Sequence, residues 1–505
     1  AKGEQEKKKE EKNKLDSLWA APPGMRWLPP VGYGSPELPD SATVIFRHAT
    51  IWTNGPEGIL RDTDLCMHEG KVRAVGKSLD AATLFPEKRK PQLTEIDARG
   101  RHLTSGIIDE HSHIAIARGV NEGGQAISAE VRIGDVIDPD DVNIYRNLSG
   151  GVTAVQQLHG SANPIGGQSA LIKLRWGLSA EQMKIDGAPG FIKFALGENV
   201  KQSTSESSTR FPRTRMGVEQ IMFDAFHRAR EYARTRDQWS VDNQKSFAKA
   251  SLAKGADRER KLRELRASGP RVDLELDALA EILAGKRFIT CHSYVQAEIL
   301  MLIRLADSLG FKVNTFTHIL EGYKVARKMQ EHGVSASSFS DWWAYKFEVY
   351  DAIPYNAALL HAAGVNVCIN SDDAEMSRRL NQEAAKAVKY GGVSEEEAWK
   401  MLTLNPAKAL RLDHRMGSLE VGKDADVVLW NANPLGISAQ AEMTFVDGLR
   451  YFDRARDHEL RKMMLAERER RVGELRLAKK SGTPTRKGGG KERGLWECET
   501  IGEEP

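Results

Sequence analysis

The chain has 505 residues, a formal net charge of +3 and a hydrophobic fraction of 40%. This length predicts two or more packed units, and so balanced a charge gives no reason to expect nucleic acid or a membrane surface as a partner. No apolar run reaches the roughly 18 residues of a membrane-spanning helix, so we expect no membrane span. The cysteines show neither the CxxC spacing of a zinc ribbon nor the pattern of a disulfide framework; they are Cys66, Cys291, Cys368 and Cys498.

Residues 1–40 are first charged and then rich in proline and glycine, which predicts an N-terminal arm outside the folded units. The chain begins with Ala1 and the charged segment AKGEQEKKKEEKNK. Such a start suits an exported chain that has lost a signal peptide, although a trimmed chain would look the same. We therefore expect a periplasmic or otherwise exported protein, with the cytoplasm as the alternative.

Two β-rich stretches near opposite ends of the chain predict one composite β domain. Residues 41–105 contain short segments such as ATVIFRHATIWT and TDLCMHEGKVRAVG, which glycines interrupt in the manner of a small antiparallel sheet. Residues 411–450 contain the similar segment GSLEVGKDADVVLWNANP. We expect the two stretches to pack together.

Residues 106–410 alternate strand-like runs, such as RFITCHS and VNVCINSDD, with helical stretches. Alternation over roughly 300 residues predicts a parallel α/β fold, and a (β/α)8 barrel fits that length. Residues 200–287 are polar and then strongly helical, so we interpret them as an insertion between the fourth and fifth strands that serves as a lid or a partner surface. Residues 451–505 predict a charged helix followed by a flexible tail.

Ionisable side chains recur where the strand-like runs of this middle region end. The run GIIDEHSHI ends in His111 and His113, which alone would be a weak signal. However, His292, His318 and Asp372 are each the first ionisable residue after a later run, and in a barrel these strand ends meet on one face. Imidazole and carboxylate suit zinc or a similar divalent ion, which activates water as hydroxide near neutral pH. Asp372 is our candidate for the carboxylate that shuttles the proton; strand capping without chemistry is the alternative.

Seven motifs, in order, resemble the amidohydrolase superfamily, most nearly imidazolonepropionase-like and related metal-dependent hydrolases. They are GIIDEHSHI, GVTAV, CHS, FTHI, the first Asp of NSDD, LNPAKAL and GSLEVGKDADVVLW, and they span residues 42–435. The resemblance implies a distorted (β/α)8 TIM barrel with a small β-sandwich domain formed from both chain ends. It also implies that His111 and His113 bind the more buried metal ion, that His292 and His318 bind a second, and that Asp372 is both ligand and proton shuttle.

A binuclear site of this family usually contains a carboxylated lysine as its bridge, and the resemblance assigns that role to Lys193 in APGFIKFALGENV. Glu198 is a rival ligand, and a mononuclear site is a further alternative. Asp109 would support His111 and His113 without binding the metal itself. The second acid of NSDD, Asp373, either binds a cationic group of the substrate or caps the next helix.

Several residues are candidates for substrate binding. Tyr294 follows His292 by two residues, as in dipeptidase-like members of the family, where the tyrosine helps bind a carbonyl or carboxylate; alternatively it opens the next helix. His159 begins the Gly-rich segment HGSANPIGGQS and would contact the substrate or polarise a carbonyl. Residues 340–356 are aromatic and predict either a wall of the site or packing on the rim.

The sequence thus favours a metal-dependent hydrolase of C–N bonds in an amide, a dipeptide or a cyclic amide, with zinc as one or two divalent ions per chain. We expect a small-molecule amide or peptide as substrate, and a homo-oligomer or an association with a related subunit. A deaminase or isomerase of the same superfamily is a close rival. A non-catalytic assembly subunit is a more distant one, since such a subunit would be expected to lose ligands that are all present here.

Overall fold

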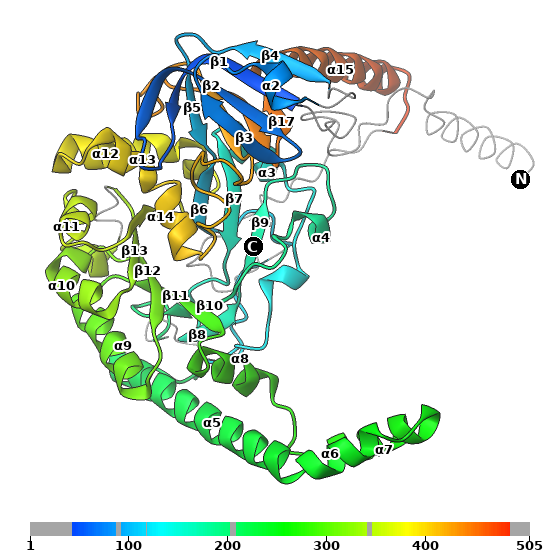
Figure 1. Cartoon of the computed structure of the whole chain (residues 1–505), viewed down its shortest axis with the longest axis vertical. Coiled ribbons are helices and arrows are strands. Elements are labelled where there is room, and N and C mark those ends of the chain that lie inside the picture. The colour runs from blue at the N-terminus through cyan, green and yellow to red at the C-terminus, as the bar shows by residue number, and fades with distance from the viewer. Residues whose placement is uncertain (1–42, 87–91, 118, 202–208, 341–345, 485–505) are drawn as a thin grey trace, which may run out of the picture.

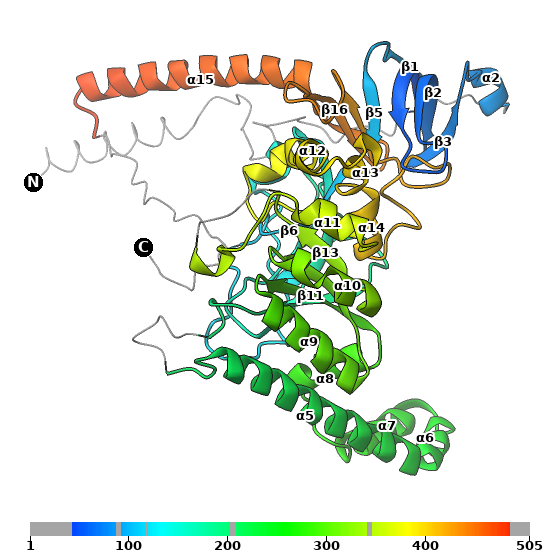
Figure 2. The same cartoon turned by 90° about the vertical axis from the view of Figure 1, so that its left-hand side faces the viewer.

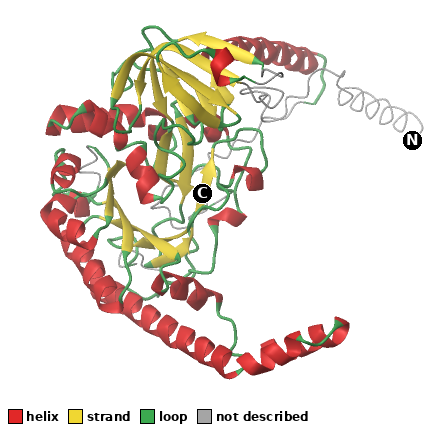
Figure 3. Ribbon diagram, in the orientation of Figure 1, coloured by secondary structure: helices red, strands yellow, loops and turns green. Residues whose placement is uncertain are grey.

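The computed structural model describes residues 43–86, 92–117, 119–201, 209–340 and 346–484. The predicted arm at 1–40, the tail from 485 with Cys498, and part of the aromatic stretch at 340–356 lie outside the described residues. The fold is mixed α/β, with one large sheet at one end of the molecule and two smaller sheets below it (Figures 1 and 3). Within the described residues, no helix is both long and apolar enough to cross a membrane.

The large sheet is built from both ends of the described chain. Its hydrogen-bonded order is β17-β16-β15-β5-β1-β2-β3, with β4 paired to β1. β5 joins the two contributions, because it pairs in parallel with β1 and antiparallel with β15. The strands are β1 (Thr43–Trp52), β2 (Ile59–His68), β3 (Lys71–Gly76), β4 (Leu93–Asp97), β5 (His102–Ser105), β15 (Val427–Trp430), β16 (Ala441–Val446) and β17 (Leu449–Asp453).

The middle of the chain forms a six-stranded sheet of order β14-β13-β12-β11-β10-β8 and a three-stranded sheet of order β6-β7-β9. β10 to β14 run parallel to one another, as do β6 and β7. The strands are β6 (Ile107–Ser112), β7 (Val152–Gln157), β8 (Ile165–Gln168), β9 (Ala170–Lys173), β10 (Gly190–Ala195), β11 (Arg287–Ser293), β12 (Val313–His318), β13 (Ser335–Ser338) and β14 (Val367–Ile369).

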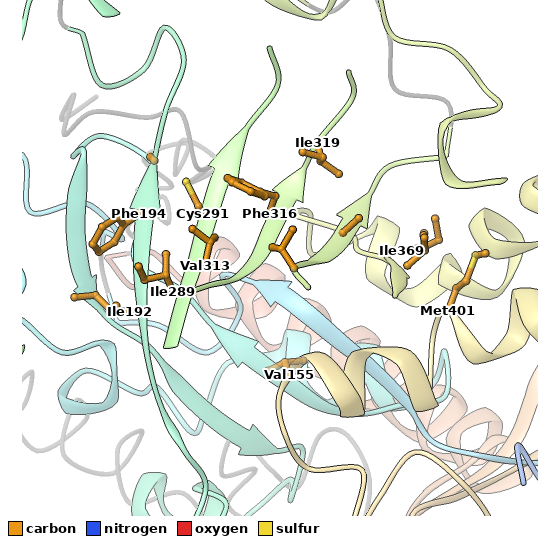
Figure 4. Packing of buried hydrophobic residues seen from close by; sticks show 14 of the residues in the cluster. Val155, Ile192, Phe194, Ile289, Cys291, Val313, Phe316, Ile319, Ile369 and Met401 are labelled. Carbon is orange, nitrogen blue, oxygen red and sulfur yellow. The ribbon is translucent and has the colours of Figure 1, made fainter. Parts of the chain in front are cut away.

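Apolar side chains from these strands form the main core, and Figure 4 shows part of it around Ile192, Phe194, Ile289 and Phe316. Because side chains of a strand alternate between its two faces, Ile192 and Phe194 pack in the core while Lys193 between them faces the other way. The helices among these strands are α3 (Val142–Leu148), α4 (Ala180–Met183), α9 (Gln296–Leu309), α10 (Gly322–His332), α11 (Asn356–Ala362), α12 (Leu380–Gly391), α13 (Glu395–Lys400) and α14 (Leu404–Ala409), and α2 (Ala81–Leu84) lies beside the large sheet.

The stretch between β10 and β11 is helical, with α5 (Arg215–Asp242), α6 (Gln244–Ser251), α7 (Gly255–Ala267) and α8 (Leu274–Leu283). The buried residues of α5 all lie between Gly217 and Ala229, so its first half packs on the body while α6 and α7 project from it (Figure 1). The predicted charged helix is α15 (Arg454–Lys480), which starts at the large sheet and projects away from it (Figure 2). It is anchored near its start, where the Tyr145 hydroxyl donates to Asp457 over 3.0 Å.

Candidate metal centre

Six of the side chains singled out by the sequence converge at one edge of the parallel sheet. The carboxylate of Asp372 places Oδ1 3.3 Å from His111 Nε2 and 3.2 Å from His113 Nε2, and Oδ2 3.6 Å from His318 Nε2. Lys193 Nζ lies 3.1 Å from His111 Nε2. The ring of His292 lies beside that of His318, with 4.6 Å between their centroids.

The strands explain this convergence, because β10 to β14 run in the same direction and their carboxyl ends meet at one edge. In the ladder Ala195 pairs with His292, and Ser293 pairs with His318. Across to the other sheet, the peptide N–H of Asp372 donates to the carbonyl of His111 over 3.2 Å. His318 and Asp372 both have left-handed backbone conformations, with φ of 66° and 49°, a strained geometry that is most common at functional sites.

The buried ring nitrogens of this cluster indicate a cation site. Among the described residues, neither nitrogen of His292 or of His318 has a hydrogen-bond partner, although buried polar atoms are nearly always paired. Ligand atoms of His111, His318 and Asp372 all lie within 4.8 Å of one another. His113 Nδ1 contacts the carbonyl of Leu158 at 2.9 Å, which directs Nε2 toward the cluster. The residues present therefore fit a divalent ion such as zinc.

The protonation states of the clustered histidines and of Asp372 also fit a metal site. Burial lowers the pKa of His318 to about 3 and holds the pKa values of His111 and His292 well below their usual range; the positive charge of Lys193 acts in the same direction. These imidazoles are therefore neutral at physiological pH, the form that binds metal ions. Burial alone would raise the pKa of Asp372, but the hydrogen bond from His113 and the neighbouring positive charges outweigh it and lower that pKa.

Asp109 supports the site in a way that the sequence did not suggest. Its carboxylate accepts the Ser371 hydroxyl at 2.5 Å and the Ser371 peptide N–H at 3.2 Å. It thus holds the backbone just before Asp372, and it also accepts a backbone hydrogen bond from His111. Burial raises the pKa of Asp109 to about 7 and that of Glu110, which is hydrogen-bonded to Ser337, to about 8.

Two aromatic rings lie against His318. The ring of Tyr294, a predicted substrate-binding residue, is stacked on it at 5.5 Å and meets His292 edge-on at 4.6 Å. Phe339 lies nearly parallel to His318 at 4.7 Å, and sequence reasoning missed it because it follows a short strand made only of serine and alanine, Ser335–Ser338. Tyr294 does not open the next helix, whose N-cap is Val295.

A charged group that the sequence also missed lies beside Tyr294. Lys346 Nζ is 4.4 Å from the centre of the Tyr294 ring and 3.2 Å from Glu348 Oε1. Glu348 Oε2 lies 3.2 Å from Arg215 and accepts the Glu198 peptide N–H at 2.9 Å. Of the two rival bridging residues, the described contacts thus put Lys193 against His111 and tie the Glu198 backbone to Glu348.

His159 and Asp373 have their polar atoms engaged with the backbone. His159 Nε2 accepts the Glu122 N–H at 2.8 Å and Nδ1 contacts the Gly160 carbonyl at 2.9 Å; burial lowers its pKa to about 4. The ring therefore organises its loop, and the predicted contact with substrate stays a prediction. Asp373 Oδ1 accepts the N–H groups of Glu375 and Met376 at 2.9 and 2.6 Å. These contacts are of the kind that the capping alternative predicts, and binding of a cationic group by Asp373 stays a prediction.

The predicted aromatic wall at 340–356 is described at Ser340 and from Lys346 onward. In this part Phe347 and Tyr350 are 85% and 78% exposed, and their rings stack on each other with 6.2 Å between centroids. These two rings are therefore exposed to solvent, whereas Tyr294 and Phe339 lie against His318.

Comparison with known proteins finds similarity to amidohydrolases. The family model described as "Amidohydrolase family" matches residues 352–451. Amidohydrolase TasK of Hapsidospora irregularis is 30% identical over 439 residues, which is 81% of this chain but only 43% of TasK. The imidazolonepropionase of Symbiobacterium thermophilum is 24% identical over 400 residues, 72% of this chain and 83% of that protein.

A solved structure gives the fold its class. The crystal structure of an amidohydrolase from Thermotoga maritima is 29% identical, with a TM-score of 0.68, and the match covers 81% of this chain and all of that one. The chain therefore has the mixed α/β fold of an amidohydrolase, with a candidate metal centre at its strand ends. The chain belongs to the amidohydrolase superfamily, as the seven motifs indicated.

Proposed function

We propose that the protein is a metal-dependent hydrolase that cleaves the C–N bond of an amide, a dipeptide or a cyclic amide. The observation that carries this proposal is the cluster of four histidines, Lys193 and Asp372 at one strand edge, with the nitrogens of His292 and His318 unpaired among the described residues. Family membership supports hydrolase activity in general; the substrate class and the metal mechanism are our proposal.

The ligand set would be His111, His113, His292, His318 and Asp372, with zinc as the leading ion. Lys193 would complete a binuclear site as a carboxylated bridge, because carbon dioxide adds to a neutral amine and leaves two oxygens that can each bind a cation. When bound, divalent ions of this kind supply acidified water and polarise a carbonyl oxygen. In the same proposal, the two smaller sheets form the halves of a distorted (β/α)8 barrel, and the large sheet folds into a β-sandwich.

The protein's own groups would bind the amide and move the proton. Asp372, whose lowered pKa keeps it anionic at neutral pH, would accept a proton from the attacking water and return it to the leaving nitrogen. Its position is fixed by its own N–H bond to His111 and by the hold of Asp109 on Ser371. Tyr294 would orient the substrate beside the imidazoles.

Elemental analysis of metal-replete protein, coupled to a screen of dipeptides, cyclic amides and aminopurines, tests the function directly. We expect one or two zinc-like ions per chain and metal-dependent cleavage of at least one amide. Release of ammonia from an aminopurine without amide cleavage would favour the deaminase alternative instead. Less than one ion per chain with no turnover of any compound would support the assembly-subunit alternative and contradict our proposal.

A further inference from the structure

Lys346 is a cation beside the metal centre to which neither the motifs nor the proposed mechanism gives a role. Its side chain is 14% exposed, so it is largely shielded but still reachable from solvent. It lies in the described segment just before η3 (Phe347–Val349). The question is what an ammonium group contributes there.

Tyr294 connects this cation with the imidazoles. The Lys346 ammonium lies 4.4 Å from the centre of the Tyr294 ring, and the same ring contacts His292 edge-on and stacks on His318. A ligand atom held by Lys346 would therefore be only one aromatic ring away from the metal ligands. The field of Lys346 reaches that far, since its charge is among those that depress the pKa values of His292 and His318.

The neighbouring acid, Glu348, pairs with Lys346 but also contacts other groups. Glu348 is buried and divides its two oxygens among Lys346, Arg215 and the peptide N–H of Glu198. Arg215 is in turn shared with Glu298, at 3.2 Å. Within this set of two cations and two acids, Lys346 is the member that contacts Tyr294, so a substrate approaching the imidazoles from that side would meet a positive charge.

We propose that Lys346 binds a carboxylate of the substrate, so that the preferred substrates are amides with a free carboxylate close to the scissile bond, such as dipeptides. An ammonium group is a compact point charge with rotatable donors, which suits a carboxylate that approaches along a loop. This inference rests on the proposed hydrolase function and adds to it the substrate class and the residue that selects it.

A matched pair of compounds tests the role of Lys346 separately from the hydrolase function. From a panel of glycyl dipeptides, the fastest substrate is compared with its decarboxylated analogue, for example glycyl-phenylalanine with glycyl-phenethylamide. We expect kcat/KM to favour the dipeptide by about tenfold or more, because a polar site discriminates strongly against a ligand that lacks the matching group. Equal cleavage of both would overturn the role of Lys346 while leaving the hydrolase function intact. The same holds if only cyclic amides are cleaved, whereas no cleavage of any amide by metal-replete protein would contradict the hydrolase function itself.

Variants then assign the preference to this lysine. In Lys346→Met we expect the ratio of the two kcat/KM values to fall by about tenfold or more, mainly through KM for the dipeptide, with unchanged metal content; Lys346→Arg should restore part of it. The matched control is Lys324→Met, because Lys324 also lies over a tyrosine, 5.8 Å from the Tyr323 ring, and pairs with the acids Glu321 and Asp351 as Lys346 pairs with Glu348. The ratio of the two kcat/KM values in this control should stay at the wild-type value.

Two results would overturn the inference: a ratio that is unchanged in Lys346→Met, or a ratio that is lowered equally in Lys346→Met and Lys324→Met. If the Lys346 variants do not fold, the wild-type protein still tests the inference. A wild-type ratio of the two kcat/KM values near one would overturn the role of Lys346.

Discussion

Two fully buried lysines, Lys173 and Lys193, lie in opposite kinds of surroundings. Lys173 Nζ is 2.8 Å from Asp424, 3.0 Å from Asp426 and 2.5 Å from Asp447. Lys193 Nζ is 3.1 Å from the imidazole of His111, in a cluster where His292 and His318 have no hydrogen-bond partner among the described residues. One buried lysine pairs with three of the protein's own acids, and the other lies against an imidazole of the candidate metal centre.

This difference separates a structural cluster from a functional one. Lys173 ends β9, while Asp424 and Asp426 precede β15 and Asp447 follows β16, so the ion pairs join the three-stranded sheet to the large sheet. A buried charge is tolerated when its partners are complete. The incomplete pairing around His292 and His318 would be costly in the protein alone, and it indicates that a ligand completes it.

The largest expected effect is on catalysis at the incomplete cluster. Asp372→Asn removes the proton-accepting oxygen but keeps the size of the side chain, so we expect kcat to fall by about 10²- to 10⁴-fold. Circular dichroism and the melting temperature should stay close to wild type. Steady-state kinetics on the substrate found by the amide screen provide the measurement, and a variant that keeps more than a tenth of wild-type kcat would refute the assigned role.

The two lysines should respond oppositely to the same substitution. Lys173→Met leaves the buried carboxylates of Asp424 and Asp426 and the partly exposed one of Asp447 without their shared cation, so we expect a loss of roughly 3–5 kcal/mol in the free energy of unfolding, measured by urea denaturation. Lys193→Met should cost much less stability and instead lower the metal content, measured by elemental analysis. If Lys193→Met proves the more destabilising of the two with full metal content, the comparison fails.

The sequence predicted that His292, His318 and Asp372 converge because each is the first ionisable residue after an apolar run, and parallel strands bring such positions to one edge. It could not predict Phe339, which follows a strand of small polar character, or the Lys346–Glu348–Arg215 contacts, which join segments 133 residues apart. The same limit hides the partners of Lys173, the nearest of which lies 251 residues further along the chain. Side-chain pairing between distant loops leaves no periodic pattern, so only the folded structure reveals it.

The stability of the protein at low pH tests the Lys173 cluster without a mutation in the metal centre. Burial alone would raise the pKa of Asp424, but the charge and hydrogen bonds of Lys173, together with Lys71 and Arg415, lower it to about 2. A carboxylate whose pKa is depressed in the folded state adds stability above its unfolded pKa of about 3.8 and loses it as the pH falls toward 2. We therefore expect the unfolding free energy of the wild type to fall steeply between pH 4 and pH 2.

The control for this pH dependence is Lys173→Met, in which Asp424 loses its main cation. Its unfolding free energy, measured by urea titration at several pH values, should be lower at pH 5 and flatter below pH 4 than that of the wild type. Parallel curves for the two proteins would show that the Lys173 cluster does not control acid stability.

The smallest effect is expected next to the largest, at Asp373. This carboxylate accepts two backbone N–H groups in the turn before η4 (Met376–Arg379), a pairing that asparagine can also make. Asp373→Ala should therefore lower the unfolding free energy by about 1 kcal/mol, and Asp373→Asn by only a few tenths. In neither variant should kcat change by more than about threefold, since the side chain faces the backbone rather than the imidazoles. If Asp373→Asn instead raised KM strongly for substrates that carry a cationic group, Asp373 would belong to the substrate site. Asp372 and Asp373 would then both act on the substrate, and only the size of their effects would differ.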